Sequence, residues 1–192
     1  RVSDWEKFFI EFNYDRQVTG NLEKAYQTLE SWYQTYPRGG DRDPPNPQDL
    51  LAGLSTRGTG RFERAIEMAQ KEIAVHPDIA IGYAALAYSY MFVDRLPEAE
   101  SILQRASERK LEGPNQLVMR YNIALLKGDQ DQMNRVVAAG KGKRGAEHQL
   151  AHAEALALAR SGRLQAAARL SNRAVDLALQ EGRREAAASY RA

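Results

Sequence analysis

Two histidines four residues apart are the side chains whose type and spacing best suit chemistry in this sequence. His148 and His152 share one face of a predicted helix, where they could join Glu154 in binding a metal ion. A metal site needs a further convergent ligand, and none stands at a suitable spacing. We therefore expect no metal site.

Two short motifs resemble ligand-binding loops. Residues 140–145 read Gly-Lys-Gly-Lys-Arg-Gly, which lacks the spacing and the Ser or Thr of a P-loop and predicts a flexible basic loop. Asp129 and Asp131 are spaced like the first ligands of a calcium loop, but the required glycine and terminal glutamate do not follow, so helix capping is expected. Neither motif predicts a cofactor.

Other catalytic signatures are absent from the 192 residues. The chain has no cysteine, which excludes disulfides, cysteine-ligated zinc and thiol chemistry. It has no HExxH motif, and none of the glycine-rich loop, HRD and DFG motifs of a protein kinase. The sequence predicts no catalytic, cofactor-binding or metal-binding residue, and hence no enzyme within this chain.

The net charge of +2 hides an asymmetry along the chain. Residues 1–133 carry 16 basic and 20 acidic side chains, a net charge of −4, whereas residues 134–192 carry 11 and 5, a net charge of +6. A basic segment can attract nucleic acid, but these bases are spread over helical periods and are not interleaved with aromatic residues. Nucleic-acid binding is therefore an alternative, and solvated helix faces are the main expectation.

Turn-forming residues recur at a fixed interval. Helix-to-helix turns are predicted at Gly20, Gly60, Asp94, Gly128 and Gly162, at successive intervals of 40, 34, 34 and 34 positions. Five positions after these turns stand Ala25, Ala65, Ala99, Met133 and Ala167. Apolar residues between the turns recur with a helical period, and the longer first interval indicates a loop insertion at 39–45.

The pattern predicts an all-α chain of helical hairpins. Helices are expected at 5–18, 21–36, 47–58, 61–75, 79–93, 96–109, 114–127, 130–140, 146–161, 164–181 and from 184 to the end. Asn21 and Asp129 are expected to cap the helices that follow them, and Pro97 suits a first turn. The longest apolar run, 79–93, is shorter than the roughly 20 residues of a membrane span and predicts a buried helix.

The constant period of the turns resembles that of the tetratricopeptide repeat (TPR). The resemblance is carried by the alanines above together with Gly53 or Ala87, Tyr90, Pro37 and Pro77. It implies one TPR solenoid domain over 1–192, a right-handed superhelix with repeats at roughly 5–38, 46–78, 79–112, 113–146 and 147–181 and a partial sixth at 182–192. Met133 and Gly140 depart from the pattern, which predicts irregular packing near 130–146.

A narrower resemblance concerns the sequences at 19–25, 32–38 and 60–65. They are similar to TPR arrays at the C-terminal end of bacterial eukaryotic-like serine/threonine protein kinases, and related arrays follow winged-helix regulatory domains. This resemblance implies a regulatory or substrate-docking role. Because the chain opens at Arg1, we expect a piece of a longer protein, cytoplasmic unless a membrane span precedes it, and then periplasmic or extracytoplasmic.

The TPR resemblance also places residues on a concave groove, which the first helix of each repeat lines. The lining residues would be Lys7, Ile10, Tyr14, Leu50, Leu54, Ile81, Ala84, Tyr88, Val118, Asn122, His152 and Leu156. Chaperone-binding TPR domains hold a carboxylate there with Lys, Asn and Arg, whereas only Asn122 matches an expected amide here. We predict an apolar, tyrosine-lined groove for an extended or helical peptide, with Tyr14 and Tyr88 packing between repeats as the alternative.

The expected partner is a protein or peptide segment, from another protein or from another domain of the same parent chain, without membrane contact by this chain. The partial sixth repeat is expected to expose an apolar face that includes Ala186, Ala187 and Tyr190. Such a face would favour end-to-end association of two chains.

Overall fold

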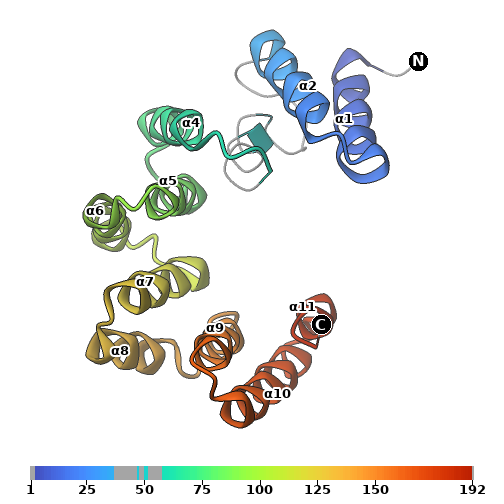
Figure 1. Cartoon of the computed structure of the whole chain (residues 1–192). Coiled ribbons are helices and arrows are strands. Elements are labelled where there is room, and N and C mark those ends of the chain that lie inside the picture. The colour runs from blue at the N-terminus through green and yellow to red at the C-terminus, as the bar shows by residue number, and fades with distance from the viewer. Residues whose placement is uncertain (1–2, 37–46, 48–49, 52–57, 192) are drawn as a thin grey trace. The chain divides into compact units, whose positions relative to one another are not determined.

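A computed structural model describes residues 3–36, 47, 50–51 and 58–191, and this part of the chain contains helices and turns without a strand (Figure 1). The elements are α1 (Asp4–Tyr14), the π-helical turn η1 (Asp15–Thr19), α2 (Leu22–Thr35), α4 (Phe62–Val75), α5 (Ala80–Phe92), α6 (Leu96–Glu108), α7 (Pro114–Lys127), α8 (Gln130–Gly140), α9 (Glu147–Arg160), α10 (Leu164–Gln180) and α11 (Arg184–Ser189). The all-α prediction is confirmed. The predicted loop 39–45 and most of the predicted helix 47–58, with Gly53 and Leu54, lie outside the described residues, as does Pro37.

The chain divides into two compact parts, an N-terminal part (Arg1–Ile102) and a C-terminal part (Leu103–Ala192). In the N-terminal part α1 packs on α2 and α4 on α5. In the C-terminal part α7 packs on α8 and α9 on α10, and α7 also packs on α9. The contacts of α1 with α2, α7 with α8 and α9 with α10 are those of predicted hairpins, whereas α4 with α5 and α7 with α9 join successive repeats.

A residue in the left-handed conformation stands at each of the five predicted turns. Four such residues are the glycines predicted to form turns, with φ between 68° and 77°, and the other is Asp94 at 58°. After Asp94, Gly128 and Gly162 the next backbone N–H bonds to the carbonyl five residues earlier, from Arg95 to Tyr90, from Asp129 to Ala124 and from Arg163 to Leu158 (each 2.9 Å). This is the Schellman motif, which satisfies the last carbonyls of a helix and favours glycine because a Cβ strains the turn.

The second helix of each hairpin then begins on a capped and closely packed turn. The side chains of Asn21 and Asp129 accept hydrogen bonds from the N–H groups of Lys24 (3.0 Å) and Gln132 (2.9 Å), which confirms both predicted caps. The repeated small residues face the hairpin interior, since Ala25, Ala65, Ala99, Met133 and Ala167 are all buried. Helix α8 is continuous from Gln130 to Gly140, so the irregularity predicted near 130–146 does not interrupt it.

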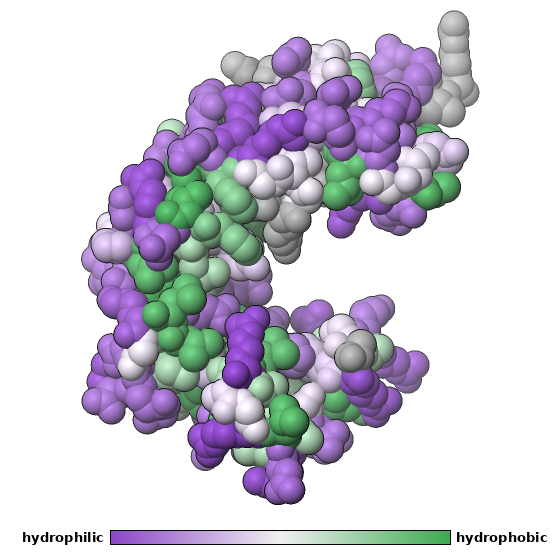
Figure 2. All heavy atoms as spheres, viewed as in Figure 1, coloured by the Kyte–Doolittle hydropathy of each residue, from purple (hydrophilic) through white to green (hydrophobic). Residues whose placement is uncertain are grey.

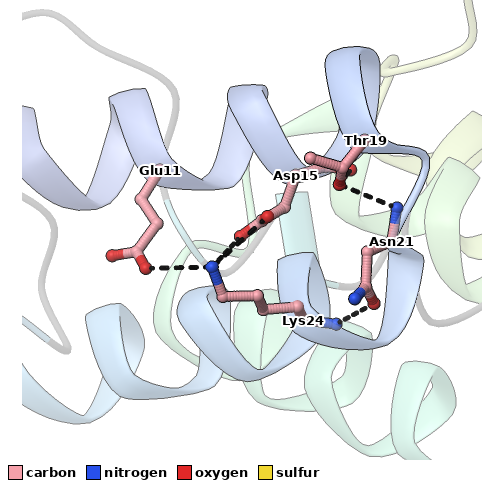
Figure 3. A network of polar contacts seen from close by, with 5 residues as sticks. All are labelled: Glu11, Asp15, Thr19, Asn21 and Lys24. Carbon is pink, nitrogen blue, oxygen red and sulfur yellow. Dashed lines mark hydrogen bonds and ion pairs between the residues drawn. The ribbon is translucent and has the colours of Figure 1, made fainter.

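The π-helical turn η1 was not expected from the sequence (Figure 3). It follows α1 at Asp15, whose carboxylate is buried and lies 3.3 Å from the Lys24 ammonium of α2. The Thr19 hydroxyl donates to the Asp15 carbonyl (2.9 Å) and accepts from the Asn21 N–H (3.1 Å). These bonds help to hold the wider turn, because the Thr19 side chain links its first carbonyl to the N–H that follows it.

Candidate interaction surface

Three apolar side chains form a stripe on the otherwise polar exposed surface of α1 and η1 in the N-terminal part. Ile10, Tyr14 and Val18 are exposed at 59%, 54% and 70%, and their regular helical spacing places them along one side. The opposite side is fixed by Phe12, which is buried against α2 in a cluster that contains Trp32. Lys7 is exposed and bonds to Asp4 (2.7 Å). Val18 was missing from the groove set, although its spacing from Tyr14 was readable in the sequence.

Helix α5 places its predicted groove residues at different depths. Ile81 is exposed at 55%, Ala84 is buried, and Tyr88 is half-buried. The Tyr88 ring lies 4.8 Å from the Phe92 ring, which in turn stacks on Phe62 of α4 at 5.4 Å. Tyr88 therefore packs on Phe92 of its own helix, and through Phe92 on α4 of the preceding repeat, as the alternative of packing between repeats predicts. Figure 2 shows hydrophobic side chains at the surface around α5. Leu50 is half-buried against the cluster around Trp32.

In the C-terminal part the predicted groove residues lie on α7 and α9. Val118 packs against the cluster that contains Leu117 and Tyr121, and Asn122 is half-buried. Leu156 is exposed at 46%. The His152 ring stacks on Tyr190 of α11, with ring centroids 4.1 Å apart, so a side chain of the same chain already covers one face of this imidazole.

The two histidines both contact Tyr190. His148 is buried at 2% exposure, its Nδ1 lies 2.8 Å from the Tyr190 hydroxyl, and its Nε2 lies 3.7 Å from Glu181. Burial lowers the pKa of His148, an effect that Glu181 opposes and Arg183 reinforces. Burial likewise lowers the pKa of His152. Among the described residues no group of three potential ligands is placed to hold a metal ion.

The same contacts correct one expectation about the partial sixth repeat. Ala187 is buried at 2% exposure, and Ala186 and Tyr190 pack against the cluster that contains Val175. The expected exposed apolar face of Ala186, Ala187 and Tyr190 was therefore wrong. Helix α11 turns these side chains toward α10 and α9, since Tyr190 reaches His148.

The two short motifs lie outside any ligand cluster. Asp129 is a helix cap, and Asp131 lies in the first turn of α8, where its charge favours the helix dipole. In the basic loop, the Gly142 N–H donates to Glu147 (2.8 Å) and the Gly145 N–H to Glu181 (2.8 Å). Two carboxylates therefore fix the loop backbone, while Lys141, Lys143 and Arg144 are exposed.

Helical hairpins of this kind, with a left-handed turn residue recurring at a constant period, define the fold of a TPR protein. No protein-family model matches the sequence, and no curated protein matches it. Among solved structures, the chain is similar to a thermophilic TPR protein of Thermus thermophilus, with a TM-score of 0.67 and 20% identity over 95% of this chain and 98% of that one. It is also similar to a TPR protein of Parabacteroides merdae, with a TM-score of 0.60 and 14% identity over 97% of this chain and 77% of that one. At these identities the likeness shows the fold alone.

Within the ranges that the structure describes, no helix is long and apolar enough to cross a membrane.

Proposed function

We propose that this chain is a scaffold that binds a protein or peptide segment and does no chemistry itself. The observation that carries the proposal is the exposure of large apolar side chains on first helices, above all Ile10, Tyr14 and Ile81. Exposed side chains at regular helical spacing offer contacts in series to an extended or helical segment. Because the helices are already formed, little conformational entropy is lost on binding.

A finer form of the proposal assigns the chain to a larger protein. The similarity of 19–25, 32–38 and 60–65 to kinase-associated TPR arrays supports a regulatory or substrate-docking region of a serine/threonine protein kinase, or of a winged-helix regulator. The sequence of the full-length gene product tests this form directly. A parent without a kinase or a winged-helix domain would contradict it.

Binding of selected peptides tests the scaffold role. Peptides are selected on the wild-type chain from a random library, and their dissociation constants are measured with Tyr14→Ala and Ile81→Ala. We expect each variant to weaken binding by about tenfold, the size of a moderate interface contact. Val75→Ala is the matched control, because Val75 is exposed at 69% on a second helix, and it should change affinity by less than about twofold. Equal effects at Tyr14 and Val75 would contradict the assignment of the face, and a selection without binders would contradict the function.

Nucleic-acid binding is the second candidate, and the exposure of Lys141, Lys143 and Arg144 is the observation in its favour. Fluorescence anisotropy titrations of short RNA and DNA oligonucleotides at low ionic strength test nucleic-acid binding, because electrostatic binding is strongest under these conditions. No binding under these conditions would exclude this candidate.

A further inference from the structure

A small pocket lies between α8, α9 and α10, away from every residue of the predicted groove. Its volume is about 230 Å³, and four charged side chains line it: Lys141, Glu147, Glu154 and Arg173. Aliphatic side chains, among them Leu150 and Leu170, form the rest of its wall. Pockets for drug-sized ligands measure roughly 300 to 1,000 Å³, so this one suits a single side chain better than a whole small molecule.

The four charges are not equally satisfied. Glu147 accepts from the Gly142 N–H (2.8 Å) and from Arg173 (2.9 Å), so these two charges compensate each other. Glu154 makes no hydrogen bond or ion pair with any other residue that the structure describes, although it is partly buried, and burial raises its pKa more than the nearby Arg173 lowers it. The buried Tyr121 hydroxyl lies close enough to Glu154 to be affected by its charge. It likewise has no hydrogen-bond partner among the described residues. A cation would therefore relieve an unpaired, partly dehydrated carboxylate.

The preceding repeat shows which cation fits. Glu154 and Arg120 are separated by one full period of the turns, so the two occupy the same position in successive repeats. The Arg120 guanidinium donates to the Leu103 carbonyl (2.9 Å) and pairs with Glu112 (2.8 Å). Val137, which lines the pocket, follows Leu103 by the same period. Where one repeat holds its own guanidinium, the next therefore has a carboxylate and an open pocket.

The backbone at this place also favours a positive charge. Val137 belongs to the last turn of α8, and the Lys141 N–H bonds to the Ala138 carbonyl (3.3 Å) rather than to that of Val137. Carbonyls at a helix C-terminus carry partial negative charge and attract cations. Lys141 opposes an incoming cation, but it is exposed, and its charge is screened by water.

We propose that this pocket binds an arginine side chain of a partner polypeptide. The guanidinium pairs with Glu154 and donates to the Val137 carbonyl, and the stem of the side chain lies on Leu150 and Leu170. The site adds a charge-specific contact to the apolar face on the first helices. It does not depend on that face, because no groove residue lines the pocket.

NMR titration of the full chain tests the proposal with three capped amino acids as probes. N-acetyl-arginine amide should bind at least about fivefold more tightly than the citrulline analogue, which keeps the shape but not the charge. The backbone amides of Leu150 and Glu154 should report this binding. Glu154→Gln should abolish the preference for arginine, while Asp176→Asn, an exposed acid of α10 outside the pocket, should leave it unchanged. Lys141→Ala should strengthen arginine binding.

A second variant still tests the proposal if Glu154→Gln fails to fold. Glu154→Arg copies Arg120, so it should fill the pocket from within, raise the midpoint of thermal unfolding and abolish probe binding. Three results would overturn the proposal: equal binding of the arginine and citrulline probes, no binding of the arginine probe, or a preference for N-acetyl-glutamate amide that Lys141→Ala removes. If the apolar face does not bind peptides, Tyr14→Ala will leave peptide affinity unchanged. The arginine titrations do not depend on that result.

Discussion

Replacing Gly140 of α8 by alanine should have two opposite effects on the free energy of unfolding, one through helix propensity and one through packing. Alanine stabilises a helix interior by up to about 1 kcal/mol relative to glycine, and less at Gly140, which is the last residue of α8, so propensity alone predicts a small stabilisation by Gly140→Ala. In the structure an added Cβ would overlap Leu150 Cδ1 and would lie 3.8 Å from the Ala146 Cβ. Leu150 is 2% exposed and belongs to the core cluster of the C-terminal part, so its side chain must shift away from the new Cβ and change its contacts in that cluster and beside the pocket.

The magnitudes favour packing. Forcing an extra carbon into a filled core costs about 1–3 kcal/mol, which exceeds the gain in propensity. We expect Gly140→Ala to lower the free energy of unfolding by about 1 kcal/mol, a fall in the unfolding midpoint of roughly 2–4 °C for a chain of this size. Ala139→Gly measures the propensity term by itself, since Ala139 is the exposed neighbour in the same helix.

Urea denaturation followed by circular dichroism, with a double-mutant cycle, separates the two effects. Leu150→Val removes the δ-carbons that the new Cβ would strike, so in that background Gly140→Ala should become neutral or stabilising. The coupling should be about 1 kcal/mol or more. The reasoning is refuted if Gly140→Ala stabilises the wild-type chain, or if the two substitutions are additive.

Three further outcomes are expected from urea unfolding. Asp129→Ala should cost about 1 kcal/mol, because the Gln132 N–H loses its cap. Tyr190→Phe should cost about 1 kcal/mol, because His148 loses the hydrogen bond to the tyrosine hydroxyl. Burial lowers the pKa of His148 below its ordinary 6.5, so the unfolded chain takes up a proton at a higher pH than the folded chain. The free energy of unfolding should therefore decrease as the pH is lowered below 6.5. The decrease should be smaller in His148→Gln. A pH dependence unchanged by His148→Gln would refute the last expectation.

The helices were predictable because their causes are local. Glycines that end first helices and alanines that pack second helices recur at fixed intervals, and the observed helices from α2 to α10 end within one residue of the predicted positions where both are described. Asp94 was predicted to form a turn only because it lies 34 positions from the turns on either side. Its φ of 58° confirms that the repeat interval can identify a left-handed turn without glycine.

The candidate surface was predictable only in part, because exposure depends on contacts between distant residues. Ile10 and Tyr14 are exposed as expected, but Ala84 is buried and Tyr190 covers His152. Tyr190 lies two helices further along the chain than His152, and no periodic signal links the two positions. The π-helical turn at Asp15 likewise depends on Lys24 of the next helix.

Departures from the repeat pattern mark the places where successive repeats differ in their contacts. Ala106 and Gln116 stand one period before Gly140 and Leu150, and at the second pair the missing Cβ of Gly140 leaves room for a δ-carbon of Leu150. That exchange is compensated within the core. Arg120 and Glu154 correspond in the same way, but here the exchange leaves a carboxylate without a partner in the described part of the chain and an open pocket beside it. A departure that is not compensated within the chain costs stability unless something else binds there, so the Arg120-to-Glu154 exchange is the stronger indication of a partner contact.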